Sequence, residues 1–120
     1  MPASILIVED EALIGASLMS SLQKRGYSCV LVGSVPDAIH QIKHQPFDAA
    51  ILDVNLRGVL IYPVAELLSS IGIPFIFTTG YPVVSFFQER PSVRKPYLAR
   101  EVLRKLAGVL GKGSDGAAVH

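Results

Sequence analysis

Acidic side chains stand directly after two short apolar runs, residues 5–8 and residues 49–52. The acidic residues at these two places are Glu9, Asp10, Glu11 and Asp53. A lone carboxylate is costly to bury, so each of them must reach water or meet a cation. Carboxylates that lie close together repel one another, and the hard oxygen ligands that they offer suit Mg²⁺. If the two runs form neighbouring strands, the sequence predicts a divalent-cation site where these strands end.

A hydroxyl and an ammonium group extend this set. Thr79 follows the apolar run 74–77, and Lys95 follows a weak strand near Val93 and Arg94. A metal ion and a lysine can neutralise phosphoryl oxygens, a hydroxyl can contact them, and a carboxylate can be the nucleophile. Each residue also has a purely structural explanation, as a helix-end charge, a turn residue or a solvated side chain. Together, at the ends of four different strands, they favour a phosphoryl-binding site.

Strands and helices alternate about five times along the chain. Apolar runs predict strands at residues 5–8, 29–33, 49–52 and 74–77, with the weak fifth strand near residues 93–94. Between the strands, apolar residues recur at helical spacing; the third such stripe runs over residues 60–71 and the last over residues 99–110. Ser34 is predicted to cap the N-terminus of the second helix. This alternation predicts an α/β fold, a doubly wound parallel sheet with helices on both faces. The carboxyl ends of its strands then meet at one edge, where chemistry gathers in such folds.

Two segments depart from the regular pattern. Residues 79–92 leave little room for a complete helix, and Pro82 and Pro91 restrict it further, so we expect a short, irregular fourth helix within residues 83–88. The very apolar run 83–87 either fills the core or forms a partner or dimer patch. Residues 111–120 are rich in Gly, Ser and Ala, which predicts a disordered tail after a single domain at residues 1–110.

The bulk composition excludes several classes of protein. The chain has 120 residues, half of them apolar, which suits one domain with a sizeable core. A net charge of +1 argues against wholesale binding to nucleic acid or to an anionic membrane. No apolar stretch approaches the roughly 20 residues that span a bilayer, and no secretory signal is visible. We therefore expect a cytoplasmic domain with neither a nucleic-acid nor a membrane partner.

The ordered set of motifs resembles the receiver domain of bacterial response regulators, over residues 4–110. The matching stretches, in order along the chain, are ILIVEDE, ILDVNL, FTTGY and RKPY. This resemblance implies a five-stranded, flavodoxin-like (CheY-like) sheet in the order 2-1-3-4-5. It also implies a cis peptide bond between Lys95 and Pro96, a form that is uncommon even before proline.

The resemblance assigns roles to the acidic residues. Asp53 matches the aspartate that a partner histidine kinase phosphorylates. Asp10 matches the direct ligand of Mg²⁺, for which Mn²⁺ can substitute, and Asp53 would ligate the same ion. Asn55 matches the position whose backbone carbonyl completes the protein ligands, and Glu9 would act through a metal-bound water.

The remaining site residues also follow from the resemblance. Thr79 and Lys95 match the residues that contact the phosphoryl group. Ordinary receivers carry an aromatic switch residue three positions before this lysine, where the present chain has Ser92. Tyr81, close to Thr79, is the candidate for that switching role, and static packing of its ring is the alternative.

A subgroup is also indicated. The run from Phe77 to Tyr81 is Phe-Thr-Thr-Gly-Tyr, which is similar to the Phe-Ala-Thr-Gly-Tyr run of the FAT GUY receivers, with Thr78 in place of alanine. Members of that subgroup are often single-domain regulators of alphaproteobacteria. They are tied to phosphorelays with kinases of the HWE and related groups, frequently in the general stress response. The implied partners are such a kinase and a downstream regulator or phosphotransfer protein.

The function expected from the sequence is a single-domain response regulator. It would accept a phosphoryl group on Asp53 and signal through protein contacts, or act as a phosphate relay or sink, as a monomer or weak dimer. It would catalyse its own phosphoryl uptake and slow loss without being a metabolic enzyme. The opening methionine and the low-complexity tail favour this over a receiver cut from a larger hybrid kinase.

Three alternatives stay open. A pseudo-receiver would be a phosphorylation-independent interaction module; the intact Asp53, Thr79 and Lys95 argue against it, whereas Ser92 leaves room for it. A flavin-binding domain of the same fold would want a phosphate-cradling loop after the first strand, where this chain has acids. A haloacid-dehalogenase-type phosphatase would want an aspartate at the position of Asn55.

Overall fold

The computed structural model describes residues 2–80 and 90–118, with side chains of the last helix described as far as Gly111. Seven strands and four helices lie in these ranges. In chain order they are β1 (Ser4–Val8), α1 (Ala12–Lys24), β2 (Ser28–Val32), α2 (Val35–His44), β3 (Ala49–Asp53), β4 (Asn55–Leu56), β5 (Val59–Leu60), α3 (Tyr62–Ser70), β6 (Phe75–Thr79), β7 (Ser92–Arg94) and α4 (Ala99–Ala118).

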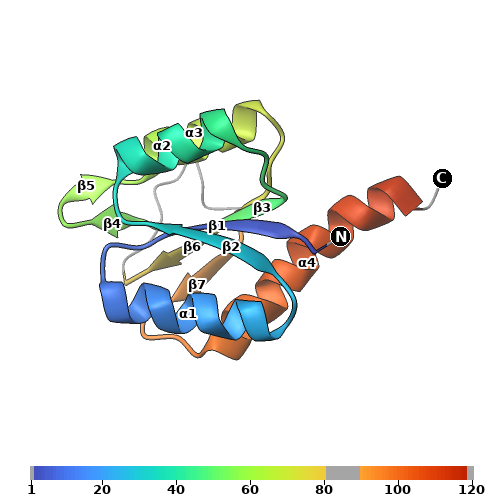
Figure 1. Ribbon diagram of the computed structural model, residues 1–120, viewed down its shortest axis with the longest axis horizontal. Helices are drawn as coiled ribbons and strands as arrows, with labels where there is room; N and C mark the ends of the chain where they lie inside the picture. Colours follow the sequence, from blue (N-terminus) through green and yellow to red (C-terminus); the bar gives the residue numbers. More distant parts are fainter. Residues whose placement is uncertain (1, 81–89, 119–120) are drawn as a thin grey trace.

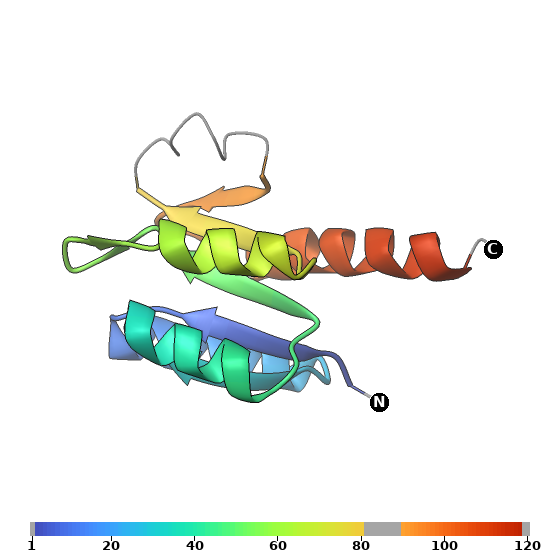
Figure 2. The ribbon, with the colours of Figure 1, turned by 90° about the horizontal axis from the view of Figure 1, so that it is seen from above.

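Five of the strands form one parallel sheet in the order β2-β1-β3-β6-β7. This is the predicted order, once the short antiparallel pair of β4 and β5 is set apart as a separate hairpin. Helices α2 and α3 cover one face of the sheet and helices α1 and α4 cover the other (Figures 1 and 2). The doubly wound, flavodoxin-like architecture is therefore confirmed.

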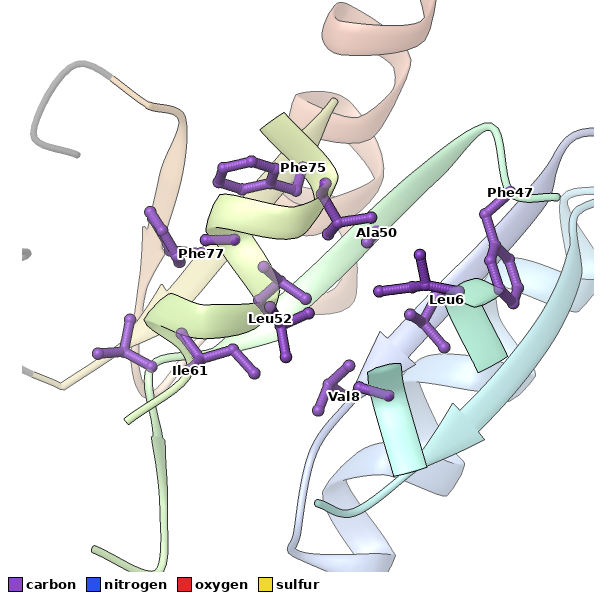
Figure 3. Close-up of a cluster of buried hydrophobic side chains, with 14 of the residues drawn as sticks. Leu6, Val8, Phe47, Ala50, Leu52, Ile61, Phe75 and Phe77 are labelled. Carbon is purple, nitrogen blue, oxygen red and sulfur yellow. The ribbon is translucent and has the colours of Figure 1, made fainter. Parts of the chain in front are cut away.

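Alternating side chains of the strands divide the core into two layers. One layer contains Leu6, Leu52 and Phe77, packed against α2 and α3 with Phe75 and Ile61 (Figure 3). The other layer lies beneath α1 and α4, and its strand residues are Ile5, Ile7, Ala49, Ile51, Ile76 and Val93. Because successive strand residues point to opposite faces, an apolar run with no polar alternation is what a sheet covered on both sides requires.

Local signals in the sequence set several helix ends. The Ser34 side chain accepts a hydrogen bond from the backbone N–H of Asp37 at 3.2 Å, which confirms the predicted cap of α2. Gly26 and Gly72 follow α1 and α3 with φ angles of +91° and +76°. This left-handed backbone is costly for other residues and commonly ends a helix.

The structure differs from the sequence-based expectation in two places. Helix α3 begins at Tyr62. The sequence placed Leu60 at the start of this helix, but Leu60 lies in the β4–β5 hairpin. There the backbone hydrogen bonds are made between the two short strands and not within a helix. Helix α4 continues to Ala118, past residue 110, where the helical stripe in the sequence ends. An established helix gains one hydrogen bond for each residue added to it, and this favours extension of α4. The glycine-rich composition of the tail had predicted disorder instead.

Two further expectations concern the region after β6. The Lys95–Pro96 peptide bond is cis, as predicted. The expected fourth helix within residues 83–88 lies outside the described residues, as does the apolar run 83–87.

Candidate functional site

The carboxyl ends of the central strands meet at one edge of the sheet. The register aligns Val8 with Leu52, Asp53 with Thr78, and Thr79 with Arg94. Glu9 and Asp10 therefore emerge beside Asp53, and Lys95 emerges beside Thr79. The β4–β5 hairpin projects from the same end of the sheet (Figure 1). The predicted gathering of polar residues from several strands is what the fold produces.

Asp53 is the last residue of β3, and its side chain is only 6% exposed. Its Oδ2 accepts a hydrogen bond from Lys95 Nζ at 2.9 Å, and its Oδ1 accepts one from the backbone N–H of Asn55 at 3.3 Å. Lys95 Nζ also lies 3.2 Å from Glu9 Oε1, whose side chain is 3% exposed. One partly buried ammonium group thus pairs with two buried carboxylates. This pairing offsets the cost of burying the charge of Asp53 at the end of the strand.

Lys95 is held in place through its backbone. Its N–H donates to the carbonyl oxygen of Thr79 at 2.8 Å, which continues the pairing of β6 and β7 beyond the end of the strand. Thr79 is the last residue of β6 and is buried. The threonine and the lysine that the sequence predicted as phosphoryl contacts are therefore fixed relative to each other.

Burial and mutual repulsion shift the protonation of this cluster. Burial raises the pKa of the Glu9 carboxyl to about 7; the hydrogen bond from the backbone N–H of Glu11 opposes the shift, and the nearby Asp53 adds to it. For Lys95, burial alone would lower the pKa, but the hydrogen bond and charge of Asp53 and the charge of Glu9 outweigh it and raise the pKa. The cluster holds more negative charge than its single lysine balances.

Oxygen atoms of Glu9, Asp10 and Asp53 all lie within 4.8 Å of one another. Three carboxylates at this separation form a donor set of hard oxygens, which suits Mg²⁺ or Mn²⁺ and not a softer metal. The raised pKa of Glu9 is the mark of uncompensated negative charge and burial that a divalent cation would relieve. The residues present therefore fit the predicted metal ion.

An open pocket lies over this cluster. It is lined by Asp10, Glu11, Asp53, Asn55, Arg57, Gly58, Thr79, Gly80 and Lys95. Five of the seven residues assigned a site role from the sequence line it, and Glu9 contacts one of these, Lys95. The seventh, Tyr81, lies outside the described residues. Ser92, at the position expected to hold an aromatic switch residue, is exposed at the start of β7.

Two residues near the pocket were not anticipated from the sequence. Arg57 Nε lies 3.2 Å from Asp10 Oδ2, although the sequence gave no reason to distinguish it from other surface arginines. The hydroxyl of Tyr97 is buried and, among the described residues, has no hydrogen-bond partner. Burial raises the pKa of this phenol to about 12, and the charge on Glu9 adds to the shift. The contact between Arg57 and Asp10 could not be found without the fold, because it joins two elements that are separate in the sequence.

Replacing Glu9 with glutamine is expected to stabilise the metal-free protein at alkaline pH. The folded-state pKa of about 7 lies above the unfolded value of 4.5, so wild-type stability falls as pH rises from about 4.5 to 7. Glutamine has no such titration, so Glu9→Gln should be about 3 kcal/mol more stable than wild type at pH 8 and nearly equal to it at pH 4.5.

Urea unfolding in EDTA at both pH values measures this difference. Exposed Glu66 offers a matched control, because Glu66→Gln removes the same charge from helix α3. Equal stability of Glu9→Gln and wild type at pH 8 would contradict the account of the charge cluster.

The sequence pattern of the response regulator receiver domain matches residues 5–89 of this chain. The chain belongs to this family. Receiver domains act in two-component signalling, where they interact with histidine kinases and with downstream partners. The acidic cluster of Glu9, Asp10 and Asp53 lies where a receiver's phosphorylation and metal site is expected.

Other receivers resemble this one in sequence and fold. "Sensory transduction protein RegX3" of Mycolicibacterium smegmatis is 32% identical over 119 residues, which cover 93% of this chain and 52% of the relative. The solution structure of SdrG from Sphingomonas melonis is 42% identical, with a TM-score of 0.80 over 91% of this receiver and 97% of that chain. A CheY-like receiver from Methanospirillum hungatei, 22% identical, superimposes with a TM-score of 0.88 over 97% of this chain and 99% of its own.

The receiver spans about half the length of the first curated relatives that it matches. No helix in the described part of the chain is both long and apolar enough to cross a membrane.

Proposed function

We propose that this receiver accepts a phosphoryl group on Asp53 from the phosphohistidine of a partner histidine kinase. The observation that carries the proposal is the position of the Asp53 carboxylate. It ends a buried strand in an open pocket, 2.9 Å from Lys95 Nζ and beside two further carboxylates. A nucleophile needs this combination of access to solvent, a neighbouring cation and room for a second cation.

The transfer exchanges one bond to phosphorus for another. An oxygen of Asp53 forms the new bond to phosphorus as the bond from phosphorus to the histidine nitrogen breaks. The released imidazole takes up a proton from solvent. Asp53 Oδ1 is oriented by the backbone N–H of Asn55 and Oδ2 by Lys95, so the carboxylate is held in one arrangement before the donor arrives.

Asp10, Asp53 and the backbone carbonyl of Asn55 would hold a Mg²⁺ ion, with Glu9 acting through a bound water. The ion would supply positive charge to the phosphoryl oxygens. Lys95 Nζ and the Thr79 hydroxyl would bind the remaining oxygens from the β6–β7 side of the pocket. The receiver domain of the sensor histidine kinase PA1611 from Pseudomonas aeruginosa, 22% identical with a TM-score of 0.79 over 92% of this chain and 99% of that one, is described with magnesium in its active-site cleft.

Phosphorylation would then bias the surface of the domain between two states. Thr79 would move toward the added phosphoryl group, as a hydroxyl donor to its oxygens. Ser92 has no ring to couple to this motion. Tyr81 is an aromatic residue two positions after Thr79 in the sequence, so we assign the switching role to Tyr81.

The receiver is further proposed to be a single-domain member of the FAT GUY subgroup. The Phe-Thr-Thr-Gly-Tyr run and the 42% identity to SdrG over nearly the whole of that solved chain support this assignment. Its partners would be a kinase of the HWE or a related group and a downstream regulator or phosphotransfer protein, in a cytoplasmic phosphorelay such as a general stress response. It would promote its own phosphorylation without metabolic turnover, with the tail after residue 110 lying outside the receiver domain.

Beryllofluoride, which mimics an aspartyl phosphate, tests the pocket without a kinase. In two-dimensional NMR spectra, Mg²⁺ and beryllofluoride together should shift the amide signals of Asp53, Thr79 and Lys95, and Asp53→Ala should abolish the response. A spectrum that does not change would favour the pseudo-receiver. The observation that supports this alternative is Ser92, which is exposed and takes the place of the aromatic switch residue. Phosphotransfer from a purified HWE-type kinase, compared with a conventional kinase, then tests the proposed partner.

A further inference from the structure

The hairpin between β3 and α3 places an arginine over the pocket. Leu56 pairs with Val59 across the hairpin, so its two-residue turn consists of Arg57 and Gly58. Leu56 is buried, and the Asn55 side chain accepts a hydrogen bond from the backbone N–H of Gly58 at 2.6 Å. The turn is therefore anchored on both sides, and the position of Arg57 is set by the fold.

Arg57 adopts a strained backbone conformation. Its φ angle is +53°, in the left-handed region where hairpin turns usually carry Asn, Asp or Gly, and the following Gly58 has a φ of +89°. The Arg57 side chain is 81% exposed, so burial does not compensate for the strain. Strain of this kind persists at functional sites more than elsewhere. The charge that this residue brings to the pocket is the feature that remains to be explained.

The guanidinium of Arg57 pairs with Asp10. Arg57 Nε lies 3.2 Å from Asp10 Oδ2, and the Asp10 side chain is only 11% exposed. The two other carboxylates of the cluster, on Glu9 and Asp53, share Lys95. Within the described residues, Arg57 is thus the cation that pairs with Asp10. The proposed function assigns the carboxylate of Asp10 as a direct metal ligand.

We propose that Arg57 is an intramolecular counter-cation that occupies Asp10 until a divalent cation displaces it, and that it thereby sets the metal affinity of the pocket. The inference rests on the proposed metal site and adds a residue that controls it. A divalent cation at Asp10 and a guanidinium at 3.2 Å from the same carboxylate repel each other, so binding must move or weaken the pair. An exposed ion pair is weak, which lets the exchange take place at modest cost.

Arg57→Asn is the variant that separates charge from backbone. Asparagine tolerates the left-handed conformation and is common in two-residue hairpin turns, so the turn should be kept while the cation is lost. Arg57→Lys keeps a cation at the same place. Arg104→Gln is the matched control, because it removes the same charge from an exposed position on α4, on the far side of the sheet from the hairpin.

Isothermal titration of the full chain with MgCl₂ and with MnCl₂ measures the effect directly. Arg57→Asn is expected to bind both ions about fivefold more tightly than wild type, a gain that shrinks as KCl is added. Arg57→Lys and Arg104→Gln should stay within about twofold of wild type. Matching circular dichroism spectra and thermal melts establish that each variant is folded.

Two results would overturn the inference. Equal affinities of Arg57→Asn, Arg104→Gln and wild type would show that Arg57 does not compete with the ion, while the proposed function stood. Absence of binding in wild type and in Arg57→Asn alike would also overturn it, and would count against the metal site itself. Asp10→Asn separates these cases, since it should lose binding wherever the site is as proposed.

Discussion

Replacing Asp53 with alanine is expected to leave a folded receiver that takes up no phosphoryl group. The carboxylate is the group that would form the new bond to phosphorus, and alanine offers nothing in its place. Glu9 and Asp10 lie within 4.8 Å but point their oxygens at Lys95 and Arg57, so neither is placed to substitute. Phosphoryl uptake from acetyl phosphate or from a kinase should therefore fall to background.

The fold of Asp53→Ala should survive because the substitution removes charge from a crowded cluster. Lys95 keeps Glu9 as a partner, and Glu9 loses a neighbour that raises its pKa. The free energy of unfolding in EDTA should stay within about 1 kcal/mol of wild type. Asp37→Ala is the control, since Asp37 is an exposed aspartate on α2. Uptake by Asp53→Ala at the wild-type rate would refute the assigned nucleophile.

Replacing Lys95 with alanine should slow phosphorylation and also lower the free energy of unfolding. The ammonium 2.9 Å from Asp53 Oδ2 is placed to balance charge on the phosphoryl oxygens, so phosphorylation should slow by about tenfold or more. The variant also leaves the buried carboxylates of Glu9 and Asp53 without their shared cation. Removing one partner of such a group destabilises a fold, here by about 2 kcal/mol at pH 8.

The stability loss in Lys95→Ala should depend on pH and on metal. It should shrink below pH 7, where Glu9 binds a proton and its uncompensated charge disappears. Added Mg²⁺ should restore part of the stability at pH 8, because a divalent cation replaces the lost charge. Urea unfolding with EDTA or MgCl₂ measures both effects, with the exposed Lys105→Ala as control. Normal phosphorylation in Lys95→Ala would disprove the role assigned to the lysine.

Much of the fold was predictable because apolar runs mark strands covered on both faces. The five sheet strands, their order and the gathering of Asp10, Asp53, Thr79 and Lys95 at one edge followed from the runs and from the family resemblance. The β4–β5 hairpin was missed because Leu60 also fits the helical stripe of α3, and spacing alone cannot decide between the two.

The pairing inside the site was not predictable from the sequence. That Lys95 pairs with both Asp53 and Glu9 depends on the register of the strands, and that Arg57 pairs with Asp10 depends on the two-residue turn of the hairpin. Sequence position identifies which polar residues reach the edge. It does not determine which charges then meet, because those contacts join residues more than 40 positions apart.

Phosphorylation of Asp53 is tested most directly by the intact mass of the protein after incubation with acetyl phosphate. Wild type should gain the mass of one phosphoryl group in MgCl₂ and none in EDTA, and peptide mapping should place it on Asp53. Asp53→Ala should gain nothing under either condition. Phosphoryl addition that persists in EDTA, or that maps to any other residue, would contradict a metal-dependent receiver site at the end of β3.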